Sequence, residues 1–397
     1  MLPHIQEEYA RKIFSGEKFE AFKTAMDEAC GMHIPYRVTE MPVFVSAAFK
    51  KKLEDAAVAI ITQCTEGEIF KASAVTLEPR YTVPRESPHP TFAVVDFAVT
   101  QDAAGEFQPK LIELQGFPSL YGYQYVFATE IKKAFGLADD WDFTFSGLTE
   151  AEYVALLKEA LLKDFSPDEC ALLEYKPLEQ KTRPDFLALK ALTGLEETDI
   201  LKVKKDGKTL LHERNGKWVP LRRIFNRAII DELDEKNVEL PFSWQDELDV
   251  EWAGHPNWYF RISKFVLPFL KHESVPKTMF LHQLDEIPSD LENYVLKPLY
   301  SFAGKGVNIA PTESDIAAIP QKDREHWVLQ EKVRYAECVY TPEGMNKVEI
   351  RVMMIWPDDA EKPLPVMSLV RTGRGPMMNV NYNSLPWSGS SGCLFGE

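Results

Sequence analysis

Two consecutive apolar runs of this chain each carry an acidic residue near their centre. The first run is FAVVDFAV (residues 92–99), with Asp96, and the second opens the segment LIELQGFPSLYG (residues 111–122), with Glu113. Both runs are short and apolar, and a polar turn separates them, so they predict two adjacent strands. A carboxylate inside an apolar strand costs free energy unless a cation, a metal ion or water compensates it. The pair therefore predicts either a binding site or a solvated sheet edge.

The residue types in these two runs suit magnesium. Side chains alternate along a strand, so Glu113 and Gln115 share one face. Asp96 on the neighbouring strand would complete a set of oxygen ligands of the kind that Mg²⁺ prefers. We therefore expect Asp96, Glu113 and Gln115 to bind the ion. The alternative is an edge strand whose polar groups lie in water.

A second candidate site is the segment YVLKPLYSFAGKGV (residues 294–307). Lys297 ends a predicted strand, and a loop of small residues follows at once. Such a loop exposes backbone N–H groups that bind phosphate oxygens, and Lys297 and Lys305 add positive charge beside them. It is not a Walker A loop, because Gly306 stands where Ser or Thr must follow the lysine. The alternative is a hairpin turn with two solvated lysines.

Two further segments predict binding strands. In WVLQEKV (residues 327–333) the backbone would bind a purine base while Glu331 meets the ribose. Farther on, Glu349 and Arg351 share a strand face. Arg371 and Arg374 would stabilise a transferring phosphoryl group or a substrate carboxylate. The alternative for both segments is an ordinary edge strand or a solvated sheet face.

The predicted elements divide the chain into three parts. Residues 1–145 are mainly helical and include the two acidic strands. Residues 146–236 alternate strands with helices, which is typical of an α/β unit, and their predicted strands include 199–204 and 218–226. Residues 237–397 are mostly strands, including 307–310, with helices over 258–270 and 314–319. This last pattern indicates an α+β lobe with an antiparallel sheet.

The overall charge excludes some classes of partner. Lys and Arg total 45 and Asp and Glu total 61, so the net charge is −16. A field of that sign repels nucleic acid and anionic lipid, and the longest apolar run is too short to span a bilayer. The five cysteines are widely spaced without a CxxC pair, and the N-terminus lacks signal-peptide features. We expect a cytoplasmic protein that binds neither nucleic acid nor membrane; homo-oligomerisation is left open.

Taken in order, these motifs resemble those of the circularly permuted ATP-grasp ligases, in particular glutathionylspermidine synthase and eukaryotic glutathione synthetase. The resemblance covers about residues 90–395, although only the motifs match. It implies an ATP-grasp-like fold that combines α/β and α+β parts. The central α/β domain at 146–236 would bind substrate, and an antiparallel-sheet lobe at 237–397, with its lid loop, would bind ATP.

The resemblance also assigns roles to individual residues. Asp96 and Glu113 would bind Mg²⁺, with Gln115 in place of the family's usual asparagine. Arg227 and Arg371 would act on the substrate. The ATP contacts would come from two lysines, the glycine-rich loop and the adenine-binding strand: Lys264, Lys297, Ser301, Ala303, Gly304, Lys305, Gln330, Glu331 and Val333.

The implied activity is ATP- and Mg²⁺-dependent ligation of a carboxylate to an amine through an acyl phosphate, on small-molecule or peptide-like substrates. The chain departs from the family in three places. The glycine-rich loop contains no acid, Gln115 replaces asparagine, and Val94 stands where glutathione synthetase has a substrate arginine. The last departure argues against the glutathione precursor as substrate. The first two keep a second hypothesis open, a degenerate ATP-grasp module that binds nucleotide without ligating. An interaction protein without a ligand and a small-molecule kinase are further alternatives.

Overall fold

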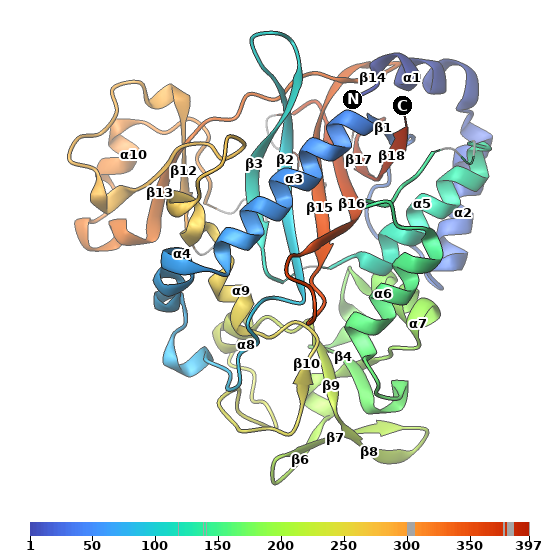
Figure 1. Cartoon of the computed structure of the whole chain (residues 1–397), viewed down its shortest axis with the longest axis vertical. Helices are drawn as coiled ribbons and strands as arrows, with labels where there is room; N and C mark the ends of the chain where they lie inside the picture. The colour runs from blue at the N-terminus through green and yellow to red at the C-terminus, as the bar shows by residue number, and fades with distance from the viewer. Residues whose placement is uncertain are drawn as a thin grey trace.

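Strands from the first and last parts of the chain form one antiparallel sheet at the centre of the molecule (Figure 1). The computed structural model describes residues 1–117, 119–137, 139, 141–299, 306–375, 378 and 385–396. The six-stranded central sheet has the order β17-β16-β15-β2-β3, and β14 pairs with β15. Its strands are β2 (Phe92–Gln101), β3 (Phe107–Gln115), β14 (Val339–Thr341), β15 (Gly344–Ile355), β16 (Leu364–Gly373) and β17 (Gly389–Ser391). The two predicted acidic strands therefore pair with each other, and β2 also pairs with β15.

Helices of the first half lie around this sheet, and α3 and α5 pack directly on it (Figure 1). They are α1 (Pro3–Glu8), α2 (Gly16–Ala29), α3 (Ala47–Cys64), α4 (Gly67–Ala72), α5 (Tyr121–Phe135), α6 (Glu150–Leu162) and α7 (Arg183–Thr193). α3 buries Phe49, Leu53, Ala57 and Ile60, whose spacing places them on one helix face. This face packs against β2, β3 and β15. Near the N-terminus, β1 (Val43–Ser46) pairs in parallel with β18 (Cys393–Gly396).

The middle of the chain forms the predicted α/β unit at the lower end of the molecule in Figure 1. Its parallel sheet has the order β10-β9-β4-β5 and consists of β4 (Cys170–Glu174), β5 (Glu197–Asp199), β9 (Arg223–Asn226) and β10 (Glu251–Trp252). A separate antiparallel sheet holds β6 (Lys204–Asp206), β7 (Thr209–Arg214) and β8 (Lys217–Leu221). α6 begins after Thr149, which forms a capping box with Glu152.

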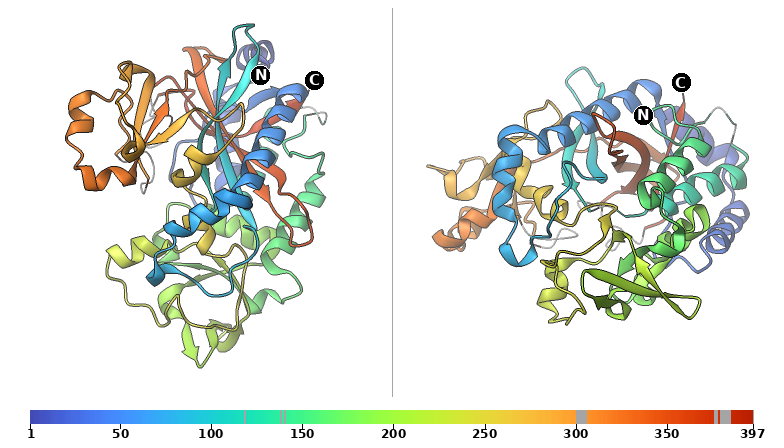
Figure 2. Two further views of the ribbon diagram at one scale, coloured as in Figure 1. Left: turned by 60° about the vertical axis from the view of Figure 1, so that its left-hand side comes forward. Right: turned by 60° about the horizontal axis from the view of Figure 1, so that its bottom comes forward.

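A smaller lobe stands beside the open edge of the central sheet (Figure 2, left). It contains an antiparallel sheet of order β11-β13-β12 and one short helix. The elements are β11 (Thr278–Phe280), β12 (Tyr294–Pro298), β13 (Trp327–Glu331) and α10 (Glu313–Ala317). Leu281, Leu291, Leu296, Ile316 and Leu329 form a small core of their own. An antiparallel lobe is thus present, but only β11, β12 and β13 of the expected lobe at 237–397 belong to it. The later strands join the central sheet, because β15 pairs with β2. The exact domain boundaries stay a prediction.

The helix predicted over residues 258–270 is interrupted. α9 (Asn257–Arg261) ends early, and a 3₁₀ helix follows over Lys264–Phe269 with Pro268 inside it. Proline lacks the N–H that would continue an α-helix and disfavours helical geometry in the residue before it. Between the two pieces Ser263 is fully extended, with φ −142° and ψ −177°.

Three predicted strands also differ from the structure. Residues 307–310 form no strand but a single bridge between Asn308 and Leu296, because the Asn308 side chain accepts the Ala310 N–H and competes with sheet pairing. The strand predicted over 199–204 is split by a 3₁₀ turn, which the Asp199 side chain caps. The strand predicted over 218–226 is split into β8 and β9. α8 (Ile230–Glu235) follows β9.

No helix in the described ranges is long and apolar enough to cross a bilayer.

Gly116 marks a close approach between β3 and α9. A β-carbon at this position would lie 2.3 Å from the backbone oxygen of Trp258. We expect Gly116→Ala to lower the free energy of unfolding by about 1–3 kcal/mol, since the buried backbone must move to make room. Urea denaturation measures the change. Gly16→Ala is the control, because a β-carbon there meets nothing within 4 Å. Equal losses for both variants would contradict the close approach.

Candidate functional site

A row of charged side chains crosses the central sheet on one face. Glu113 of β3 lies opposite Asp96 of β2, and Asp96 lies opposite Arg351 of β15. Glu349 lies opposite Arg371 of β16. Residues directly opposite each other in an antiparallel sheet share a face and interact. The register therefore brings together side chains from the first third and the last quarter of the sequence.

Asp96 is the most buried member of this row, with 2% of its side chain exposed. Its carboxylate accepts hydrogen bonds from Arg351 Nε at 2.5 Å and Arg351 Nη2 at 2.7 Å, and Arg371 Nη1 lies 3.3 Å away. Burial alone would raise the pKa of Asp96, but the two guanidinium groups outweigh it and hold the pKa below its usual value. The structure thus places Asp96 in a charge pair, where both of its oxygens are engaged.

Arg371 joins this pair to a second carboxylate. Its Nη1 lies 3.0 Å from Glu349 Oε2, and the Tyr335 hydroxyl donates to the other oxygen of Glu349. Burial lowers the pKa of Arg371, but Asp96 and Glu349 outweigh it and keep the guanidinium charged. Arg371 was predicted to act on the substrate, and 22% of its side chain is exposed.

Lys297 connects the lobe to the central sheet. It is 8% exposed, and its Nζ donates to Gln330 Oε1 at 2.6 Å and to the backbone oxygen of Ile112 at 3.2 Å. The pairing of β2 with β3 shifts register beside Asp96, so Ile112 is the extra residue of a bulge. Burial lowers the pKa of Lys297 to about 8, although nearby Glu113 opposes the shift. A lysine that is half deprotonated near pH 8 is unusual and is typical of a functional site.

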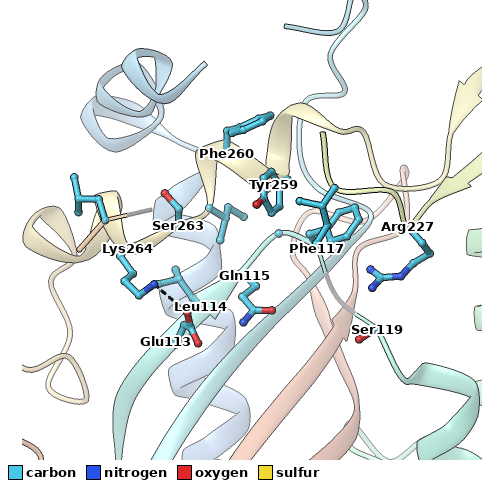
Figure 3. A pocket seen from close by; sticks show the side chains of 14 residues that line it. Glu113, Leu114, Gln115, Phe117, Ser119, Arg227, Tyr259, Phe260, Ser263 and Lys264 are labelled. Atoms are coloured by element: carbon cyan, nitrogen blue, oxygen red, sulfur yellow. Dashed lines mark ion pairs between the residues drawn. The ribbon is translucent and has the colours of Figure 1, made fainter. Parts of the chain in front are cut away.

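A pocket opens beside these residues, between β3, α9 and the start of the 3₁₀ helix (Figure 3). Lys264 follows the interruption at Ser263, and its Nζ lies 3.5 Å from Glu113 Oε1. Gln115 lies on the same strand as Glu113 and also lines the pocket. Of the predicted site residues, Glu113, Gln115, Arg227 and Lys264 therefore meet in one cavity.

Arg227 forms the far end of this pocket (Figure 3). It follows β9, is 8% exposed, and its guanidinium carbon lies 4.4 Å from the ring centre of Phe117. Burial lowers the pKa of Arg227, against the opposing charges of Glu174 and Asp185. No ion pair joins Arg227 to Asp231, both of which the structure describes; Asp231 accepts from the Tyr259 hydroxyl.

Asp185 was not predicted, yet it shapes the segment after β3. It is 1% exposed and accepts hydrogen bonds from the backbone N–H groups of Leu120 and Tyr123, both at 2.9 Å. It therefore caps the start of α5 from another helix. Leu120 adopts a φ of 77°, a region that non-glycine residues rarely occupy. The only signal in the sequence was an acid in the first turn of an amphipathic helix, which ordinarily faces water.

The remaining predicted ATP contacts are placed only in part. Gln330 is 2% exposed, and its amide donates to Thr278 Oγ1 at 2.9 Å. Glu331 is exposed at the end of β13, and Val333 lies two residues beyond it. Ser301, Ala303, Gly304 and Lys305 lie outside the described residues. Within the described ranges no group of three or more His, Cys, Asp or Glu residues could hold a metal ion, so a magnesium site there would need amide or ligand oxygens as well.

Comparisons with known proteins were informative only at the level of structure. No protein-family model matches the chain, and no curated protein matches it in sequence. Among solved structures it is similar to a glutathione synthetase-like effector (GSS30) from Globodera pallida, in the apo form. The two have 12% sequence identity and a TM-score of 0.58, and the match covers 95% of this chain and 96% of that chain. At this identity the likeness shows the fold alone. The chain thus has a mixed α/β fold of the ATP-grasp-like kind, as the sequence predicted.

The ion pairs of Asp96 make a testable contribution to stability. Asp96→Asn leaves Arg351 buried without its counter-charge, so we expect the free energy of unfolding to fall by about 3–5 kcal/mol. Urea unfolding followed by circular dichroism gives the value. Asp206→Asn, an exposed strand carboxylate on β6, is the matched control and should change little. If both substitutions lower the free energy of unfolding by the same amount, the buried ion pairs of Asp96 do not contribute to stability.

Proposed function

We propose that this protein is an ATP- and Mg²⁺-dependent ligase that joins a carboxylate to an amine through an acyl phosphate. The observation that carries the proposal is the convergence of two largely buried lysines on one carboxylate. Lys264 lies 3.5 Å from Glu113, and Lys297 lies close enough for both residues to influence its pKa. Two buried cations beside the pocket of an ATP-grasp-like fold suit the phosphates of a nucleotide.

The residues at this position also suit magnesium. Glu113 and Gln115 offer a carboxylate and an amide oxygen in the same pocket, and Mg²⁺ is commonly held by one or two protein oxygens together with phosphates. Glu113 and Gln115 would hold the ion, which would neutralise charge on phosphate oxygens. Asp96, predicted from the sequence as a third ligand, instead holds Arg351 and Arg371 in place.

The other residues would orient the reactants. Lys297 is fixed by Gln330 and Ile112, so its ammonium group would bind phosphate without reorganising. Arg371 is held by Asp96 and Glu349 with part of its side chain exposed, and would stabilise negative charge at the reacting carboxyl. Arg227 would bind the substrate at the other end of the pocket. The apolar walls between them would exclude water, which hydrolyses acyl phosphates.

The ion pairs that Asp96 makes with Arg351 and Arg371 favour a second function. With both its oxygens bound to arginine, and with no acid in the sequence of the glycine-rich loop, fewer carboxylates are left for metal ions than the family pattern requires. The protein would then bind nucleotide without ligating. Phosphate release from ATP in the presence of a panel of acids and amines distinguishes the two: binding with turnover supports the ligase, and binding without turnover supports the degenerate module.

Lys297 is the direct test of nucleotide binding. Lys297→Met keeps the length of the side chain but removes the charge, so we expect most ATP affinity to be lost while the fold persists. Isothermal titration calorimetry with ATP and Mg²⁺ measures the affinity. Lys110→Met on β3, whose Nζ instead contacts the Glu273 backbone oxygen, is the control. Unchanged affinity in a folded Lys297→Met protein would remove the basis of the proposal.

The lowered pKa of Lys297 predicts two opposite trends with pH. ATP affinity should fall as the pH rises through about 8, because Lys297 loses its charge. In the unfolded chain a lysine titrates near 10.4. Between those two pKa values this lysine binds more protons in the unfolded state, so the contribution of Lys297 to the stability of the ligand-free protein should rise with pH. The buried cysteines, whose pKa values are raised, contribute in the opposite direction over this range. Thermal unfolding at several pH values checks this. The stability of the wild-type protein relative to Lys297→Met should therefore rise with pH, and a difference that does not change with pH would assign the titration to another group.

A further inference from the structure

The antiparallel sheet β6-β7-β8 protrudes from the lower end of the molecule and has one covered face and one open face (Figure 1). Leu210 and Leu221 lie opposite each other and are fully buried in the core of the α/β unit. The residues next to them along the strands point to the other face, because side chains alternate in a strand. This outer face includes Lys204, Asp206, Leu211, Glu213, Trp218 and Pro220.

A tryptophan is exposed on this outer face. Trp218 is 41% exposed, and the Lys204 ammonium lies 3.7 Å from the centre of its ring. Leu201, shortly before β6, is also 41% exposed. Tryptophan contributes strongly to binding energy where it becomes buried in a contact between proteins. The outer face thus offers an apolar centre with a cation beside it.

The same segment is basic in a chain that is acidic as a whole. Residues 202–222 contain seven Lys or Arg and two Asp or Glu, a net charge of +5, whereas the whole chain carries −16. Lys202, Lys208 and Lys217 are exposed, and among the described residues none of the three has an ion-pair partner. An acidic partner therefore gains an attraction here that the molecule does not satisfy by itself.

The small lobe presents a surface of the opposite kind. Residues 278–296 contain no Lys or Arg. Ile287 lies in the middle of this segment and is 36% exposed. The acids around it are exposed, and within the described ranges none of them forms an ion pair: Asp285, Glu286, Asp290 and Glu292. The segment therefore combines carboxylates with an exposed apolar side chain, as the outer face of β6-β7-β8 combines lysines with Trp218.

These two surfaces do not meet within one molecule. The lobe and β6-β7-β8 stand well apart in each view (Figures 1 and 2). A contact between them therefore needs a second copy of the chain. Nucleic acid or an anionic lipid surface fits the sheet less well, because the outer face also carries Asp206 and Glu213, which a continuous layer of phosphates would repel.

We infer that this protein self-associates, with the outer face of β6-β7-β8 in one copy bound to residues 285–292 of the lobe in a second copy. The lysines of the sheet face the carboxylates of the segment, and Ile287 packs beside Trp218 and Leu211. Both surfaces are small, so we expect a contact below the roughly 1,600 Å² of a standard stable interface. The net charge of −16 also opposes association. The contact is therefore weak and depends on protein concentration.

Charge reversal on each surface tests the contact. Lys204→Glu with Lys208→Glu reverses the sheet, and Asp285→Lys with Glu286→Lys reverses the lobe. Sedimentation velocity at increasing concentration, up to the submillimolar range, measures association. We expect the wild-type protein to associate and each double variant alone to do so about tenfold or more weakly, because like charges then face each other. Circular dichroism establishes that each variant is folded.

Mixing the two double variants is the sharper measurement. The reversed sheet of one then meets the reversed lobe of the other, and the native sheet meets the native lobe, so the mixture should associate about as strongly as the wild-type protein. A wild-type protein that stays monomeric at the highest concentration would overturn the inference. So would a mixture that stays as dissociated as its two components.

Two controls separate the contact from net charge. Lys158→Glu with Lys362→Glu changes two exposed lysines outside both surfaces and alters the net charge as much as the sheet variant does, so it should leave association unchanged. The lobe variant makes the chain less negative, which by itself favours association; its weaker association must therefore come from the contact. Equal weakening in the control and the sheet variant would assign the effect to net charge and overturn the inference.

Trp218→Ala tests the apolar part of the contact. The substitution keeps every charge and removes the ring that is expected to pack against Ile287, so association should weaken about tenfold. Wild-type association in a folded Trp218→Ala protein would overturn the placement of Ile287 beside Trp218. All of these measurements are made without ATP, and neither surface lines the pocket, so their outcome is independent of the proposed ligase activity.

Discussion

The burial of one carboxylate, that of Asp96, governs much of this structure. Asp96 lies inside a six-stranded sheet and needs cationic partners there. Those partners, Arg351 and Arg371, come from strands 255 and 275 residues farther along the chain. A shift of one residue between β2 and β15 would turn Asp96 away from both. The charge pairs thus favour a single register, and that register sets Glu113 and the bulge at Ile112 beside the lobe.

Local signals in the sequence were sufficient for most elements near the site. Two short apolar runs separated by a polar turn predicted β2 and β3, because these patterns depend on near neighbours. The partners of Asp96 were not predictable in this way. Arg351 was recognised as sharing a strand face with Glu349, but which strand lies next to β2 is decided by packing between distant segments. The acid that the sequence assigned to magnesium therefore lies against arginine, and its role as a metal ligand stays a prediction.

The same limit applies around the pocket. Lys264 was placed on a long helix, whereas α9 ends at Arg261 and Ser263 is extended, so Lys264 reaches Glu113 from an irregular segment. Asp185 carried no signal of its own, because its role depends on the backbone of a different helix. Residues such as Arg227 were found through the resemblance of motif order alone. The sequence thus indicated the components of the site but not the contacts that position them.

The shifted pKa values at the site share one physical origin. On and beside one sheet face, Asp96, Glu113 and Glu349 are opposed by Arg351, Arg371, Lys264 and Lys297. At Asp96 the nearby guanidinium groups stabilise the ionised carboxylate, so its pKa lies below the usual value. Where cations gather with less compensation, as at Lys297, burial lowers the pKa to about 8. An anion placed there would relieve the surplus positive charge and raise that pKa again. Binding of an anion there would therefore be linked to protonation of Lys297, because the cations beside the pocket are already in place.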